Sequence, residues 1–171
     1  MKSIQRLTAQ IRAYRSDLKG LPAWVLGGVI LVAALTLGFW HSLPDVTKLK
    51  GCLTTSMYGV RLCPDEPDYI RLKDVAPEFI QALLKSEDAG FYGHSGFDWY
   101  EIRKSVEKNL EEMGYVRGGS TITQQLAKNV FLSPEKSLLR KLKEAVLTYQ
   151  IENHFTKTEI LERYINVVEF G

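Results

Sequence analysis

The chain has 171 residues, of which 45% are hydrophobic and 25% charged, a composition typical of one modest globular domain with an additional segment. Its formal charge is only +2, and the basic excess is confined to the first 20 residues, which carry five basic side chains against one acidic. Nucleic-acid-binding proteins usually carry such an excess on the folded domain, so the sequence predicts no nucleic-acid partner.

An uncharged run, LPAWVLGGVILVAALTLGFW (21–40), follows this basic leader. It would span about 30 Å as a helix, the thickness of a bilayer's hydrocarbon core, and Trp24 and Trp40 lie near its ends, where aromatic rings favour the interface. The positive-inside rule therefore predicts a cytoplasmic leader (1–20), a single-pass anchor (21–43) in the cytoplasmic, or inner, membrane, and an extracytoplasmic remainder. A cleaved signal peptide is the alternative, but the run is long and lacks a clear small-x-small site.

Residues 44–72 are interpreted as an extracytoplasmic linker with short extended pieces and a turn at CPDEPDY. Cys52 and Cys63 lie in this segment. A disulfide between them is plausible in an oxidising compartment. Two free thiols fit nearly as well, because spacing alone fixes no geometry.

From residue 73 onward the apolar residues recur at helical spacing, with no internal repeat and no alternating strand series. The exported part is therefore predicted to be mainly α. A first helix is expected to run through PEFIQALLKSE, and the glycines of the stretch that follows it break that helix into a loop. The later helix starts are predicted from capping residues: Asp98, Thr121 with Gln124, Ser133-Pro134-Glu135, and Thr156 with Glu159.

Glu87 occupies an unusual place in that first helix. It lies on the apolar stripe, seven residues after Ile80 and four after Leu83, and near the helix C-terminus, where the macrodipole disfavours a negative charge. In one interpretation the carboxyl is partly desolvated, which disfavours its charged form and suits a general acid or base near neutral pH. In the other, the helix frays by Glu87 and the carboxylate points to water.

The segment GGSTITQQLAKN (118–129) combines two glycines with a predicted helix start. Glycines allow a backbone to approach a ligand closely, and amide donors at a helix N-terminus suit phosphate. An ordinary capped surface helix is the alternative. In the next helix Arg140 and Glu144 are four residues apart, which usually means an exposed ion pair; a cationic cluster facing a pyrophosphate is the functional interpretation.

Four segments, EDAGFYGHSGFD, GGSTITQQLAKN, RKLKE and KTEILERYIN, occur in the order, and at about the spacing, of the peptidoglycan glycosyltransferases of family 51. The chain resembles the monofunctional biosynthetic members of this family, membrane-anchored transglycosylases that polymerise lipid II. The resemblance implies a mainly α, lysozyme-like glycosyltransferase domain at 73–171 behind a single transmembrane helix. Because the family domain continues past the position of Gly171, the chain is expected to be either a C-terminally truncated fragment or a naturally short form.

The resemblance also assigns roles to individual residues. Glu87 would be the general base that removes the proton from the 4-hydroxyl of the acceptor's N-acetylglucosamine, as inversion at the donor expels undecaprenyl pyrophosphate. Glu144 matches the second conserved acid, which is thought to assist at the leaving group or through a divalent cation. The residues implied in substrate binding are Asp88, Phe91, His94, Ser120, Thr121, Gln125, Lys128, Asn129, Arg140 and Lys141. No cofactor is required, although a divalent cation, Mg²⁺ or Mn²⁺, is compatible with the pyrophosphate.

Lipid II, the growing glycan strand, membrane lipid and other cell-wall synthesis proteins are the partners that this resemblance implies. Two other functions remain open. A lysozyme-like hydrolase would also use a pair of acids in a helical domain, and a non-catalytic, membrane-anchored scaffold would use none. The basic cluster beside the glycine-serine-threonine helix start favours a pyrophosphate donor, which a hydrolase does not need.

Overall fold

The computed structural model describes residues 22–114 and 118–168 and divides the chain into two compact units, Met1–Leu43 and Pro44–Gly171. The leader expected at 1–20 lies outside the described residues. In the first unit, helix α2 spans Ala23–His41 and buries none of its side chains against protein. A helix that is apolar on all sides and uncovered by protein suits lipid. By length and composition α2 can cross a membrane, as expected of an anchor.

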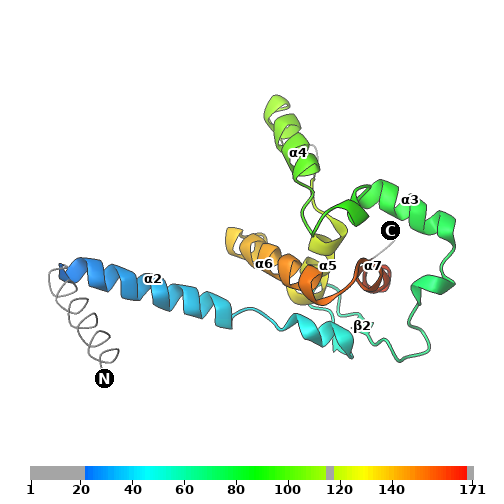
Figure 1. The fold of residues 1–171 in the computed structure, drawn as a ribbon, viewed down its shortest axis with the longest axis horizontal. Coiled ribbons are helices and arrows are strands. Elements are labelled where there is room, and N and C mark those ends of the chain that lie inside the picture. Colours follow the sequence, from blue (N-terminus) through cyan, green and yellow to red (C-terminus); the bar gives the residue numbers. More distant parts are fainter. Residues whose placement is uncertain (1–21, 115–117, 169–171) are drawn as a thin grey trace, which may run out of the picture. The chain divides into compact units, whose positions relative to one another are not determined.

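The second unit is mainly helical, as the sequence predicts, and is consistent with a lysozyme-like domain (Figure 1). The only strands among its described residues are two residues long. Its elements in chain order are η1 (Val46–Lys50), β1 (Leu53–Thr54), β2 (Arg61–Leu62), η2 (Leu72–Asp74), α3 (Pro77–Glu87), η3 (Phe91–Gly93), α4 (Trp99–Glu111), α5 (Ile122–Phe131), α6 (Leu138–His154) and α7 (Lys157–Ile165).

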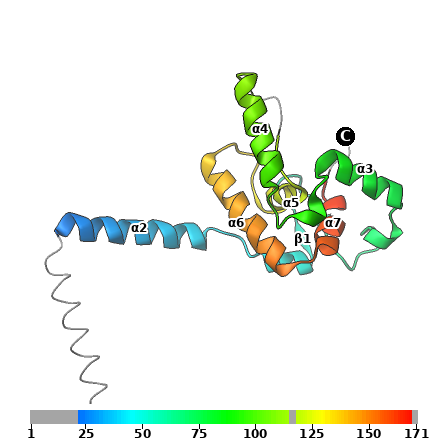
Figure 2. The same cartoon turned by 45° about the horizontal axis from the view of Figure 1, so that its top comes forward.

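Helix α5 lies at the centre of the core, in contact with both α6 and α7 (Figure 2). The apolar side chains that these three helices turn toward one another are fully buried: Ile122, Leu126 and Ala127 from α5, Leu147 and Ile151 from α6, and Ile160, Leu161 and Tyr164 from α7. Their three- and four-residue spacing is that of one helix face. Helix α4 projects from this cluster, and Ser105 is the one residue that it buries.

The helix starts largely follow the capping residues in the sequence. The side chain of Asp98 accepts from the N–H of Glu101, and full capping boxes form at Thr121 with Gln124 and at Thr156 with Glu159. The predicted start of the long helix is wrong. Helix α6 begins at Leu138 because Ser137, rather than Ser133, accepts the N–H three residues ahead.

Residues 44–72, expected as a linker, are part of the folded unit. Val46 and Leu49 of η1 and Leu62 of β2 are buried, so the segment contributes to the core rather than spanning solvent. A disulfide joins Cys52 to Cys63 and closes the antiparallel β1–β2 hairpin, which decides between the two alternatives for these cysteines.

The tip of this hairpin continues the hydrogen bonding of α5. The backbone N–H groups of Ser56 and Met57 donate to the carbonyls of Val130 and Asn129, at 2.8 and 3.1 Å. Carbonyls in the last turn of a helix lack partners within the helix. The hairpin therefore caps α5 and fixes the position of Met57 beside it.

Candidate active site

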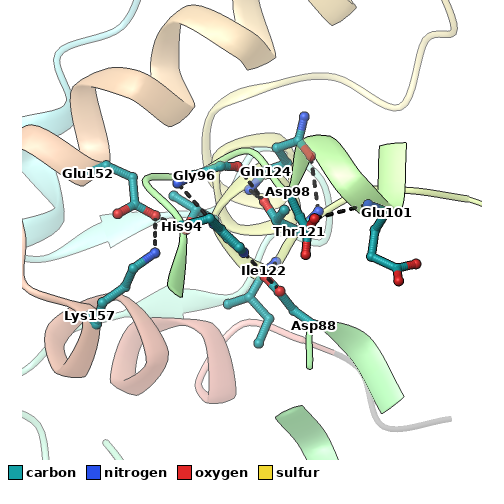
Figure 3. Close-up of polar contacts among 11 residues, drawn as sticks. Asp88, His94, Gly96, Asp98, Glu101, Thr121, Ile122, Gln124, Glu152 and Lys157 are labelled. Atoms are coloured by element: carbon teal, nitrogen blue, oxygen red, sulfur yellow. Dashed lines mark hydrogen bonds and ion pairs between the residues drawn. The ribbon is translucent and has the colours of Figure 1, made fainter. Parts of the chain in front are cut away.

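Asp88 links the end of α3 to the start of α5 (Figure 3). Its side chain is buried, with one carboxylate oxygen accepting from the backbone N–H of Ile122 at 3.0 Å. The other oxygen lies 2.9 Å from Nε2 of His94, and the N–H of Gly96 donates to Nδ1 of the same imidazole at 3.2 Å. Because Nδ1 accepts, Nε2 carries the proton and donates it to Asp88.

Thr121 and Gly96 hold the glycine-rich loop against the helices. The hydroxyl of Thr121 donates to the carbonyl of Gly96 at 2.7 Å. Gly96 has φ +87, and a Cβ at this position would lie 2.7 Å from a methyl carbon of Thr148 on α6. Only glycine combines this left-handed backbone with so close an approach. Thr121 and His94 are thus held by the same loop.

The N-terminus of α5 is not a free anion site, which is one of the two interpretations of this segment of the sequence. The N–H of Thr121 donates to Gln124, that of Ile122 to Asp88, and that of Gln124 to the Thr121 hydroxyl. The anion at this helix start is therefore the Asp88 carboxylate, which satisfies an end donor and suits the helix dipole. Gly119 likewise approaches α4, since a Cβ there would lie 3.2 Å from Cα of Ile102.

Glu87 is the last residue of α3, and it is exposed. Of the two interpretations of the helical pattern, the partly desolvated carboxyl is therefore wrong and the carboxylate that faces water is correct, although α3 continues to Glu87 rather than fraying before it. The carboxylate is held by a different contact: Nε2 of Gln125, on α5, donates to Oε2 of Glu87 at 2.9 Å. This hydrogen bond joins two residues that the sequence places 38 positions apart.

A cleft of about 320 Å³ opens beside Glu87. Its walls come from the end of α3, the start of α4 and the segment before α5: Lys85, Ser86, Glu87, Asp88, Ala89, Asp98, Glu101, Gly118, Gly119, Ser120 and Thr121. Four of these residues are acidic. A group that accepts protons and an acidic wall suit a neutral, hydroxyl-rich ligand better than an anionic one.

A second cleft, of about 770 Å³, has the opposite charge. Its described lining includes Lys128, Lys136, Arg140 and Lys141, with Glu144 as the only acid among the described residues. Met57, Pro134 and Leu138 form an apolar part of the wall. Ser120 lines both clefts, and Nζ of Lys141 lies 3.5 Å from the Ser120 hydroxyl. The acidic and the basic cleft therefore meet at Ser120.

Glu144 is the buried centre of the basic cluster. The residue is 2% exposed, its Oε2 lies 3.1 Å from Nη1 of Arg140, and its Oε1 pairs with Nζ of Lys141. A buried carboxylate that pairs with two cationic side chains fixes both cationic groups in place. The i,i+4 pair in the sequence is therefore not an ordinary exposed ion pair.

Not every residue implied by the family resemblance lines a cleft. Phe91 is 1% exposed and packs under Nζ of Lys157, which lies 4.4 Å from the ring centroid. Nζ of Lys157 in turn donates to the carboxylate of Glu152 (Figure 3). The same carboxylate also accepts from the hydroxyl of Thr123. Asn129 is 3% exposed and His94 is bonded on both ring nitrogens. Phe91, His94 and Asn129 are not among the described residues that line either cleft.

Three residues near the clefts were missed in the sequence. Lys136 and Met57 line the basic cleft, and Tyr164 of α7 donates from its hydroxyl to Oε1 of Gln125 at 3.0 Å. Burial and the nearby charges of Glu87 and Asp88 raise the pKa of Tyr164, so its hydroxyl remains protonated. A tyrosine on the apolar face of a helix usually needs a hydrogen-bond partner when buried, which is the signal that could have identified it.

Asp88, His94 and Asp98 place three potential metal-ligand atoms within 4.8 Å of one another. Their hydrogen bonds argue against a metal ion. Nε2 of His94 carries the proton donated to Asp88, and the remaining nitrogen already accepts from Gly96. A metal-bound imidazole needs one free lone pair and usually donates its other N–H, so this cluster fits a structural role.

A family model and curated relatives that match this chain all carry the name transglycosylase. The transglycosylase family model matches residues 57–171. Over 149 residues the chain is 40% identical to the biosynthetic peptidoglycan transglycosylase of Dechloromonas aromatica (strain RCB), covering 86% of this chain and 62% of the relative. It is 47% identical over 111 residues to the protein of the same name from Acinetobacter baumannii (strain SDF), covering 63% and 49%. The chain thus spans about half to three fifths of these relatives.

Proposed function

Since the chain belongs to the transglycosylase family, we propose that it is a peptidoglycan glycosyltransferase that polymerises lipid II. One observation carries the proposal: an acidic cleft holding an accessible carboxylate, Glu87, meets a basic cleft at Ser120. Transfer from a polyprenyl pyrophosphate requires a proton acceptor at one side of the reacting carbon and stabilisation of an anionic leaving group at the other.

In this mechanism the acceptor sugar occupies the acidic cleft. Glu87 takes the proton from the 4-hydroxyl of the acceptor sugar. The oxygen of this hydroxyl forms a bond to the anomeric carbon of the growing strand while the bond from that carbon to the pyrophosphate oxygen breaks. The configuration inverts from α to β, and undecaprenyl pyrophosphate leaves. A well-positioned base contributes about 10²–10⁴ in rate.

The basic cleft receives the pyrophosphate. Lys128, Lys136, Arg140 and Lys141 supply four positive charges, of which Glu144 compensates one. The ion pairs to Glu144 hold Arg140 and Lys141 before substrate arrives, so little reorganisation is needed when the charge develops. The apolar wall at Met57 and Leu138 is suited to the first carbons of the polyprenyl chain.

Glu144 is poorly placed to hold a divalent cation itself. Both of its oxygens are paired with cationic side chains, which would repel Mg²⁺ or Mn²⁺. The four basic residues therefore neutralise the charge of the leaving group, without a metal ion held by Glu144.

The basic leader and the apolar α2 support a single-pass topology with the N-terminus in the cytoplasm. This orientation puts the folded unit outside the inner membrane. Lipid II, the growing glycan strand and membrane lipid are then its immediate partners, with other cell-wall synthesis proteins around it.

The test is polymerisation of fluorescent lipid II in detergent by the 171-residue chain, compared with Glu87→Gln and Glu78→Gln. Glu78 is exposed in the first turn of the same helix, so the second variant is a matched control. Polymer from the wild type and Glu78→Gln, with at least a 100-fold loss in Glu87→Gln, supports the proposal.

Other outcomes reject parts of it. Equal polymer from Glu87→Gln would remove Glu87 as the base. No polymer from any of the three proteins would contradict transferase activity of this chain and favour a scaffold. Release of fragments from purified peptidoglycan by the wild type would favour a hydrolase.

A further inference from the structure

A chain of two hydrogen bonds links the core to the proposed catalytic carboxylate. The hydroxyl of Tyr164, a fully buried residue of α7, donates to Oε1 of Gln125 at 3.0 Å. Nε2 of the same amide donates to Oε2 of Glu87 at 2.9 Å. Three separate helices, α7, α5 and α3, thus contribute one group each.

The direction of both hydrogen bonds is determined chemically. An ionised carboxylate only accepts, so the NH₂ group of Gln125 must face Glu87 and its carbonyl must face inward. The inward carbonyl then needs a donor, which the Tyr164 hydroxyl provides. Since burial, with the charges of Glu87 and Asp88, raises the pKa of that hydroxyl, it does not lose its proton in the working pH range.

We infer that Tyr164 is a positioning residue for Glu87, acting through the side-chain amide of Gln125; this inference rests on the proposed function. Glu87 is an exposed side chain at the end of a helix, and such a side chain has several accessible rotamers. One donor of fixed position selects among them. Gln125 can be that donor only while its own amide is fixed by the hydrogen bond that the buried Tyr164 hydroxyl donates to Oε1.

The charges around Glu87 do not replace this contact. Lys85 on α3 lines the same cleft, as do Asp88 and, from the start of α4, Asp98 and Glu101. Three of these four are acidic and repel a carboxylate, so they favour its displacement. Gln125 is neutral and therefore orients Glu87 without cancelling its charge.

The first test is a double-mutant cycle in lipid II polymerisation. Tyr164→Phe removes only the hydroxyl, and Gln125→Met removes both polar atoms of the amide at similar length. We expect Tyr164→Phe to lower kcat about 3- to 10-fold, the effect of one hydrogen bond, with KM changed less than twofold. In the Gln125→Met background, the same substitution is expected to cause no further loss.

Tyr69→Phe is the matched control, because Tyr69 is half-buried near Glu162, outside both clefts. It should leave kcat unchanged. Equal losses from Tyr164→Phe in both backgrounds would show a general structural effect and overturn the inference, as would an unchanged kcat in the single variant.

A second test does not depend on activity. In protein with isotope-labelled glutamine, the NMR signal of the Gln125 side-chain amide is identified because it is lost in Gln125→Met. It is expected to shift in Glu87→Gln and in Tyr164→Phe, and to stay unchanged in Tyr69→Phe. An unchanged signal in Tyr164→Phe would overturn the inference. Absence of polymer from the wild type would instead count against the proposed function, so the two failures are distinguishable.

Discussion

Replacing Asp88 by asparagine should break a chain of hydrogen bonds, because a neutral amide at position 88 cannot accept both of the hydrogen bonds that the carboxylate accepts. In the wild type, the Gly96 N–H donates to His94, His94 donates to one oxygen of Asp88, and the Ile122 N–H donates to the other. Asparagine has one oxygen and one NH₂ group. The NH₂ group of the asparagine must face either the Ile122 N–H or Nε2 of His94. If His94 changes tautomer so that Nε2 can accept from the NH₂ group, Nδ1 of His94 carries the proton, and this Nδ1–H then faces the Gly96 N–H.

Every arrangement of Asp88→Asn therefore leaves one pair of donors facing each other in a buried place. An unsatisfied buried donor costs about 1–3 kcal/mol, and the charge assistance of the original carboxylate is also lost. We expect the free energy of unfolding to fall by about 2–3 kcal/mol. For a domain of this size that corresponds to a decrease of roughly 6–12 °C in melting temperature.

The measurement is thermal unfolding in detergent, followed by far-UV circular dichroism. Asp98→Asn is the control, because the Asp98 side chain accepts from the Glu101 N–H at a helix N-cap, where asparagine works equally well. Its melting temperature should change by less than about 2 °C, since such a cap exchange costs under about 0.5 kcal/mol. A loss below 0.5 kcal/mol in Asp88→Asn would refute the donor-chain reasoning.

Three other predictions concern the fold that holds the site. Gly96→Ala should lower the free energy of unfolding by about 2–4 kcal/mol, because the residue has φ +87 and its Cβ would lie 2.7 Å from Thr148; denaturant titration measures this, and a near-neutral result would contradict it. Replacing Cys52 and Cys63 together by serine should cost roughly 2–3 kcal/mol from loop entropy, whereas equal melting temperatures with and without reductant would argue against the bridge. Hydrogen bonds from the backbone and the hydroxyl of Thr156 lower the pKa of Glu159. The contribution of the Glu159 carboxylate to the free energy of unfolding is therefore present above pH 4.5, the value for the unfolded chain, and is lost as the pH falls through the lower pKa of the folded state. The difference in melting temperature between the wild type and Glu159→Gln should accordingly become smaller in acid.

Local patterns in the sequence were sufficient for the helices and for most of their boundaries. A capping box is a contact between residues three apart, so Thr121–Gln124 and Thr156–Glu159 could be predicted from the chain alone. The predicted start of α6 was wrong because Ser133 and Ser137 can both serve as N-caps, and the helix uses only Ser137. The apolar run of α2 was equally recognisable, since length and composition define such a helix.

The surroundings of individual side chains were decided by tertiary structure. Helical periodicity put Glu87 on an apolar stripe, but Leu83 is the only residue that α3 buries, so the stripe does not enclose the carboxyl. Periodicity gives the face on which a residue lies, not whether another element covers that face. The linker prediction failed for the same reason, because the burial of Val46, Leu49 and Leu62 depends on the helices against which they pack.

The sequence by itself determined that this protein has an apolar helix long enough to cross a membrane, a mainly α domain and the residue types of a transglycosylase. Only the tertiary structure decided which of those residues meet. Gln125 and Glu87 are 38 positions apart, and Tyr164 and Gln125 are 39 apart. Hydrogen bonds over such separations require the packing of α5 between its neighbours, which no local pattern encodes. The physical reason is that a side chain's chemistry is set by its own atoms, whereas its charge state, orientation and partners are set by whatever the fold brings beside it.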